Sequence, residues 1–134
     1  MSKATKNRGA PTMTTKAFHK SAAWQTGLRP YFEYRDLGIV EATGGKVLAH
    51  VIRATGSCPG PGGYHTHDLQ FQMNYVLKGW TRVEFEDDGE IRFEAGDSWY
   101  QAPNIKHEVL EFSDDFEVIE ITMPAQFPTA DAQR

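Results

Sequence analysis

The sequence has a single cysteine, no long apolar stretch and no excess of basic residues. Cys58 alone cannot form a disulfide within the chain, nor a zinc site built from cysteines. No apolar run exceeds three residues, whereas a helix that spans a membrane needs about 20. The 14 basic and 18 acidic residues give a net charge of −4, the wrong sign for a general nucleic-acid binder. We therefore expect a soluble, cytoplasmic protein without a membrane or nucleic-acid partner.

The composition that remains is ordinary for one globular domain. The chain has 134 residues, of which 40% are hydrophobic and 24% charged, too apolar a mixture for a disordered protein. The charge is unevenly placed, because residues 1–20 contain five basic residues and no acidic one. This segment lacks the apolar core of a secretory signal. Residues 1–16 are therefore predicted to be a flexible tail, or in part an extension that precedes a natural start at Met13.

From residue 31 onward the sequence is typical of β-structure. β-branched and aromatic residues gather in short runs, separated by turns rich in Gly, Pro, Asp and Asn. Because the runs recur about every ten residues, they predict an all-β sandwich or barrel over 31–124 and not alternating strands and helices. An arm or short helix is predicted over 17–30, and an irregular tail over 125–134. The predicted strands are 47–52, 71–77, 81–85, 91–94, 98–101, 107–112 and 117–123.

Three of the five histidines suggest a metal site. His65 and His67 are two residues apart, so on a β-strand both imidazoles project to the same side, about 7 Å apart. Neutral imidazole is a good ligand for Zn, Fe, Ni and Cu, although such pairs are also common on protein surfaces. A Gly- and Pro-rich segment precedes the pair, and His107 begins a later predicted strand after a Pro-Asn turn.

The spacing of the histidines extends to other residues in two stretches. These stretches are His65-x-His67-x4-Gln72-x6-Gly79 and Gly96-x10-His107. They resemble the two motifs of the cupin superfamily, G-x5-H-x-H-x3,4-E-x6-G and G-x5-P-x-G-x2-H-x3-N. The resemblance covers residues 46–123 and is closest to small, single-domain bacterial cupins. It implies a double-stranded β-helix, a jelly-roll-like barrel, that holds one divalent transition metal such as Fe, Ni, Zn or Mn.

The resemblance also implies which residues bind the metal. His65, His67 and His107 correspond to the three family histidines, and Gln72 stands where the family has a glutamate. Glutamine brings no negative charge, so we expect weaker metal binding and a stronger Lewis acid that favours an anionic ligand. Two alternatives remain open. Gln72 hydrogen-bonds a substrate or a metal-bound water instead, or the site has lost its metal.

Two residues are candidates for catalysis. Glu111 shares a face with His107 if the strand is regular, so we expect it to shape the cavity or act as a base on a long substrate. Tyr64 faces outward by alternation unless the preceding loop turns it over the metal. Glu108 points to the opposite face and is expected to be solvated. His50 falls outside the motifs and has no evident role.

One row of apolar side chains predicts a second copy of the chain. If Gln72 points inward, the outer face of the same strand carries four large apolar residues. Such a row is unusual on a monomer, so we expect a homodimer, or cover by the N-terminal segment with Phe18 and Trp24. The four residues are Phe71, Met73, Tyr75 and Leu77.

Three functions fit these features. The first is a metal-dependent enzyme, dioxygenase-like or a lyase or isomerase, acting on a small oxygen-bearing molecule that chelates the metal. The second is a non-enzymatic module that binds or senses a small molecule. The third is a structural protein built on the same barrel. We favour the enzyme, and the substrate stays undefined because one fold hosts many activities.

Overall fold

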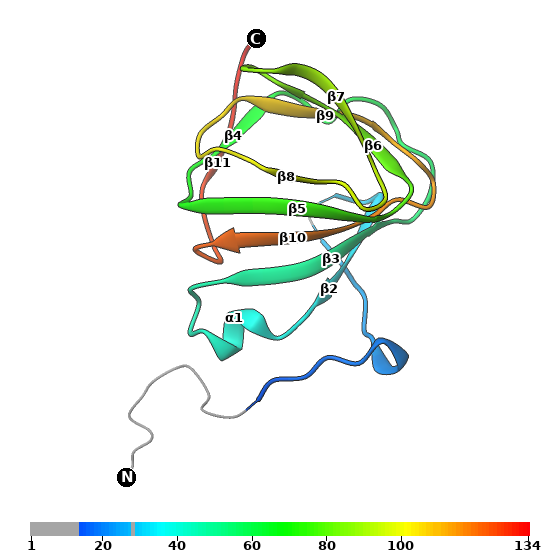
Figure 1. Cartoon of the computed structure of the whole chain (residues 1–134), viewed down its shortest axis with the longest axis vertical. Helices are drawn as coiled ribbons and strands as arrows, with labels where there is room; N and C mark the ends of the chain where they lie inside the picture. The colour runs from blue at the N-terminus through cyan, green and yellow to red at the C-terminus, as the bar shows by residue number, and fades with distance from the viewer. Residues whose placement is uncertain (1–13, 28) are drawn as a thin grey trace.

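The computed structural model describes residues 14–27 and 29–134, which form two antiparallel β-sheets (Figure 1). The six-stranded sheet has the order β1-β2-β3-β10-β5-β8, and the five-stranded sheet has the order β11-β4-β9-β6-β7. The predicted all-β class is confirmed. The strands are β1 Gln25–Thr26, β2 Phe32–Asp36, β3 Leu48–Ala54, β4 His65–His67, β5 Phe71–Lys78, β6 Trp80–Phe85, β7 Gly89–Glu94, β8 Ser98–Tyr100, β9 His107–Phe112, β10 Glu117–Met123 and β11 Thr129–Asp131.

The seven predicted strands are all present, and none of their ends differs by more than two residues from the prediction. The prediction did not list β1, β2 or β4, although it considered His65 and His67 as residues of a strand. It also expected an irregular tail where β11 forms and pairs with β4. Most of the predicted flexible tail, including Met13, lies outside the described residues.

Helical structure in the described part of the chain is short. The 3-10 helix η1 His19–Ser21 lies in the predicted arm, and α1 Ile39–Ala42 connects β2 to β3 and packs against β3. Across residues 14–27 and 29–134, no helix has the length and apolarity needed to cross a membrane.

The space between the two sheets is filled by side chains from both of them. Along β5, for example, Gln72, Asn74 and Val76 are buried whereas Tyr75 and Leu77 are exposed, as the two-residue period of a strand requires. Gln72 therefore points inward, which is the condition on which the expected outer row of apolar residues depended. The buried apolar cluster consists of Val76, Val83, Phe85, Phe93, Phe112, Phe116 and Val118.

A β-bulge in β9 changes which side chains face the interior. The pairing with β6 shifts by one residue, which leaves Leu110 without a partner. His107 and Phe112 are both buried, although their odd spacing would place them on opposite faces of a regular strand. Glu111 is therefore turned to the outer side, where it pairs with Arg82 at 2.8 Å. Glu111 therefore does not share a face with His107, because the regular strand assumed in that prediction contains the bulge.

Apolar side chains are exposed on the outer face of the six-stranded sheet. Tyr75 and Leu77 on β5 are 42% and 38% exposed. The ring of Phe71 lies 5.9 Å from that of Tyr100 on the neighbouring strand β8, which extends the apolar surface. We call the exposed group the outer patch, and it consists of Tyr75, Leu77, Tyr100 and Met123.

Candidate metal centre

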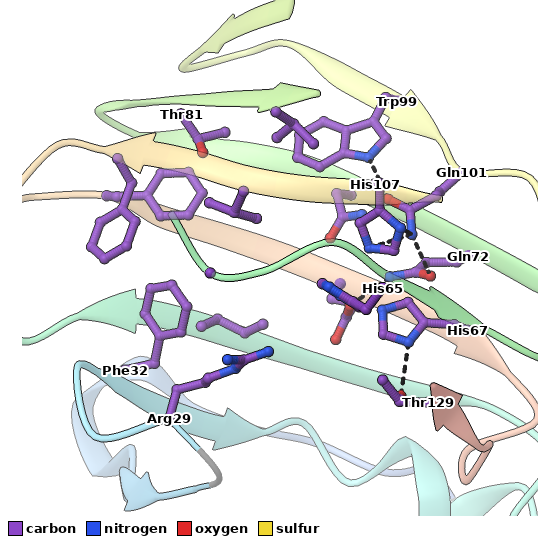
Figure 2. Close-up of a pocket in the computed structure, with 18 of the residues that line it drawn as sticks. Arg29, Phe32, His65, His67, Gln72, Thr81, Trp99, Gln101, His107 and Thr129 are labelled. Atoms are coloured by element: carbon purple, nitrogen blue, oxygen red, sulfur yellow. Dashed lines mark hydrogen bonds between the residues drawn. The ribbon is translucent and has the colours of Figure 1, made fainter. Parts of the chain in front are cut away.

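Three histidines from two strands meet between the sheets (Figure 2). His65 and His67 lie on β4 and His107 begins β9, and the pairing of these strands places His65 directly opposite His107. The ring centroids are 4.2 Å apart for His65 and His107, 4.8 Å for His65 and His67, and 4.9 Å for His67 and His107. One nitrogen from each ring lies within 4.8 Å of the others, so the cluster is compact enough to hold one metal ion.

The backbone fixes the orientation of two of these rings. Nδ1 of His65 donates to the carbonyl oxygen of Gly63 at 2.7 Å, and Nδ1 of His107 donates to that of Ile105 at 3.0 Å. A carbonyl oxygen only accepts, so both rings carry their proton on Nδ1 and leave Nε2 as an acceptor with a lone pair. Metal-binding histidines in proteins are commonly held in this way through their second nitrogen.

The third ring is held by the C-terminal segment. β11 pairs with β4 and places the hydroxyl of Thr129 2.8 Å from Nδ1 of His67 (Figure 2). Phe127 packs edge-on against the same ring, with 5.2 Å between the centroids. The segment expected to be an irregular tail is thus part of the site.

Gln72 is buried beside the histidines, and its amide is fixed at both ends. Its Nε2 donates to Oε2 of Glu120 at 2.7 Å, and its Oε1 accepts from Nε2 of Gln101 at 3.2 Å. Gln101 also lies 3.1 Å from Nε2 of His107. The oxygen of Gln72 and Nε2 of His107 thus both face the same amide nitrogen of Gln101. A glutamine in this orientation can offer its oxygen to a metal.

Glu120, which sequence analysis missed, supplies a negative charge next to Gln72. It lies on β10, and its Oε1 is 2.7 Å from Nε2 of His50 on the neighbouring strand β3. Burial favours a higher pKa for Glu120, but the hydrogen bond and charge of His50, together with His67 and Gln72, lower the pKa below its usual value. The carboxylate is therefore charged. A glutamate inside the apolar strand 117–123 was the available signal.

The surroundings of His67 and His107 favour the neutral form of both rings. Burial, followed by the nearby His65, lowers the pKa of His67 to about 4. Burial likewise lowers the pKa of His107 to about 4, against the opposing hydrogen bond to Ile105. Neutral imidazole is the form that binds metal ions, so the cluster is ready for a metal at neutral pH.

A cavity of about 290 Å³ extends from the histidines into the apolar core. Its volume is close to the lower limit of about 300 Å³ for small-molecule sites. Figure 2 shows the histidines, Gln72, Gln101 and Trp99 at one end, and Phe32 with further aromatic rings at the other. The aromatic lining residues are Tyr31, Phe32, Tyr34, Trp99, Phe112, Phe116 and Phe127.

The two candidate catalytic residues are not among those that line this cavity. Glu111 faces outward, and the ring of Tyr64 lies against the guanidinium of Arg134, 4.7 Å from its centroid. The expectation of a solvated Glu108 is wrong. The side chain of Glu108 is buried. Its carboxylate accepts a hydrogen bond from the backbone nitrogen of Gly63 at 3.0 Å and pairs with Arg134, and these contacts replace the lost water.

Comparison of the sequence with known protein families identifies the family of this chain. The family model described as "Cupin domain" matches residues 54–122, which is more than half of the chain. The chain belongs to the cupin family. The resemblance inferred from the two motifs is thereby confirmed.

Several solved structures show the same fold at low sequence identity. KdgF from Halomonas sp. is 21% identical, with 83% of this chain and 95% of that chain covered and a TM-score of 0.67. The polyketide cyclase RemF from Streptomyces resistomycificus is 13% identical, with 91% and 87% covered and a TM-score of 0.73. Oxalate decarboxylase from Bacillus subtilis is 14% identical, with 91% and 33% covered and a TM-score of 0.66. No curated protein gives a significant match.

Backbone geometry explains two positions of the cupin motifs. Gly79 has a φ of +67°, and a Cβ there would lie 2.0 Å from Oγ of Ser113, so only glycine fits. Asn104, in the turn before His107, has a φ of 62° where the family motif has glycine. Asparagine tolerates this region better than most residues, which preserves the turn that presents His107.

Acid should destabilise the metal-free protein because His107 is neutral in the fold. Its pKa is about 4 there, against 6.5 as the ordinary value, so the unfolded chain binds more protons between these limits. The stabilisation is complete above pH 6.5 and is lost as the pH falls towards 4. In urea unfolding with a chelator, wild type should lose more stability between about pH 7 and pH 5 than His107→Gln does. The exposed His19→Gln is the control, and equal losses in wild type and His107→Gln would contradict the prediction.

Proposed function

We propose that this cupin is a metal-dependent enzyme that acts on a small oxygen-bearing molecule able to chelate the metal. The observation that carries the proposal is the cluster of three histidines at the polar end of the cavity, with their Nδ1 atoms already bonded elsewhere. His65, His67 and His107 would hold the metal, and the oxygen of Gln72 would be the fourth ligand. A divalent metal bound here supplies a Lewis acid that stabilises negative charge on a substrate oxygen.

The chain's own residues prepare the cavity for such a substrate. Thr129, Gly63 and Ile105 hold the rings of the three histidines in place, and Glu120 holds the amide of Gln72. The aromatic rings at the far end exclude water from the substrate, which strengthens the electrostatic interactions at the polar end.

We favour lyase- or isomerase-type chemistry over a dioxygenase-like reaction. With the neutral Gln72 as fourth ligand, the metal keeps its full charge and is suited to stabilising an enolate. The names of two similar structures, a polyketide cyclase and an oxalate decarboxylase, support this choice. A non-enzymatic cupin that binds a small molecule is the alternative, and it would bind a ligand without turnover.

The first test is the metal content of the purified protein. Wild type, after anaerobic incubation with Fe(II), Ni, Zn or Mn and desalting, should retain close to one metal per chain in elemental analysis. His107→Ala should retain little, because it removes one of three histidine ligands, while the exposed His19→Ala should behave as wild type. Circular dichroism checks that both variants fold. A wild-type protein without metal under all four conditions would contradict the proposal.

A second test concerns the division of charge between Gln72 and Glu120. Glu120→Gln should weaken Zn²⁺ binding by about tenfold or more, since outer partners of ligands commonly contribute that much. Gln72→Glu alone should increase the affinity for Zn²⁺ only slightly, because it places a second carboxylate next to that of Glu120. The double variant moves the charge onto the ligand and should bind at least as tightly as wild type.

The measurement is the dissociation constant for Zn²⁺ by competition with a chelator, for all four members of the cycle. Glu117→Gln is the matched control, because Glu117 lies on the same strand and pairs with the exposed Lys78 at 3.6 Å. Additive effects at positions 72 and 120 would show that the two residues do not share this role.

We also propose that the outer patch forms the interface of a homodimer. The N-terminal arm leaves the patch uncovered in the described residues, since Phe18 is itself 65% exposed and Trp24 lies against Arg53, 3.8 Å from guanidinium to ring. Large apolar side chains exposed together on one face of a sheet often mark contact surfaces between proteins.

Light scattering should give twice the chain mass of 15.1 kDa for the wild-type protein. Leu77→Asp should shift the protein to the monomer, because it buries a charge in the interface. Phe18→Asp should leave the mass unchanged, because Phe18 is a more exposed apolar residue that lies in the arm and not in the patch. A wild-type monomer would disprove the dimer without affecting the metal site.

A further inference from the structure

Arg29 carries a positive charge into the cavity. Besides the histidines, it and Glu120 are the charged residues that line this space. Arg29 precedes β2, and its backbone oxygen accepts a hydrogen bond from the nitrogen of Phe32 at 3.2 Å. Figure 2 shows its side chain on the same side of the cavity as Phe32, with the guanidinium directed towards the histidine cluster.

The guanidinium of Arg29 has no carboxylate partner among the described residues. All 18 acidic residues fall within residues 14–27 and 29–134, and none of them lies within ion-pair distance of Arg29. Glu120, the other charged residue in the cavity, already binds His50 and Gln72. An arginine keeps its charge and offers five N–H donors, so a partly buried one without an acceptor is costly.

Asn74 is a second polar side chain in the cavity for which the described residues provide no hydrogen-bond partner. It is only 6% exposed, it lines the cavity, and its amide makes no hydrogen bond to any residue that the structure describes. Buried polar groups are nearly always hydrogen-bonded, to protein or to a bound molecule. Two unsatisfied polar groups on one cavity therefore indicate a ligand that carries polar groups of its own.

The rest of the cavity limits the body of this ligand. Tyr31 and Phe112 form a stacked pair with centroids 5.7 Å apart, and Phe32 packs against Phe112 at 4.9 Å. These apolar walls favour an apolar or planar body, and the volume of about 290 Å³ limits it to a small molecule. The planar fork of arginine matches a carboxylate with two parallel hydrogen bonds.

We propose that Arg29 binds a carboxylate of the substrate, which makes the substrate class a small carboxylate with an apolar or aromatic body. A second oxygen-bearing group of the same molecule faces the three histidines. The position of that second group rests on the function proposed above, whereas the ion pair with Arg29 does not require a metal.

The experiment compares two probes that differ in charge alone. 3,4-Dihydroxybenzoate and 3,4-dihydroxybenzamide share a catechol that can chelate a metal, and they have nearly the same shape. The Zn²⁺-loaded protein should bind the acid about tenfold or more tightly than the amide in calorimetric titration, as expected for a charged hydrogen bond. Arg29→Gln should remove this preference and leave the zinc content unchanged, and Arg29→Lys should keep part of it.

Arg92→Gln is the matched control, because Arg92 is an exposed arginine on β7 that pairs with Glu94 at 2.9 Å. It removes the same charge from the protein and should leave the preference for the acid intact. An equal loss of preference in Arg92→Gln would assign the effect to net charge and overturn the proposal. Equal binding of acid and amide to the wild type, or binding of neither, would also overturn it.

A parallel titration with chelator separates this inference from the proposed metal function. In NMR titrations, the metal-free wild type should still prefer benzoate to benzamide, and Arg29→Gln should not. If the wild type binds no metal and yet shows this preference, the enzyme proposal fails and the role of Arg29 stands. If metal binds but neither the loaded nor the metal-free protein prefers the acid, the role of Arg29 fails alone.

Discussion

The pairing of β4 with its two neighbours is the constraint on which the site depends. β4 has only three residues, and it is held between β9 on one side and β11 on the other. One neighbour brings His107 opposite His65, and the other brings Thr129 to His67. The Gly- and Pro-rich segment before β4 is tied to β9 by the hydrogen bond from Gly62 to the carbonyl of Val109 at 2.9 Å.

The interior is organised by charge as well as by apolar packing. Glu120 is a buried carboxylate, and such a group is tolerated only when hydrogen bonds compensate for the lost water. His50 and Gln72 provide them, at 2.7 Å each. The cavity thus has a fixed negative charge behind Gln72, and Arg29 brings a positive charge without a described partner. The walls of the cavity are largely aromatic, so these two opposite charges determine how a polar ligand is oriented in it.

Local signals predicted most of the fold. Strands could be predicted because apolar residues that alternate between two turns indicate burial of one face. This pattern depends only on residues that are adjacent in the chain. β9 and β10 have the predicted bounds, 107–112 and 117–123. β11 was missed because three exposed residues carry no such alternation, and it exists only through its pairing with β4. Glu111 was misplaced because the bulge at Leu110 arises from the register with β6.

The sequence by itself determined the family and the three histidines of the cluster, as the pair His65 and His67 and the separate His107. Each of these follows from spacing within a strand or a motif, where two residues' separation sets their relative orientation. Only the tertiary structure decided what surrounds them. Glu120, Gln101, Thr129 and Arg29 reach the site from segments far apart in the chain, and no local pattern records which strands pair. The charge missing from Gln72 could therefore be located only once β10 was seen beside β5.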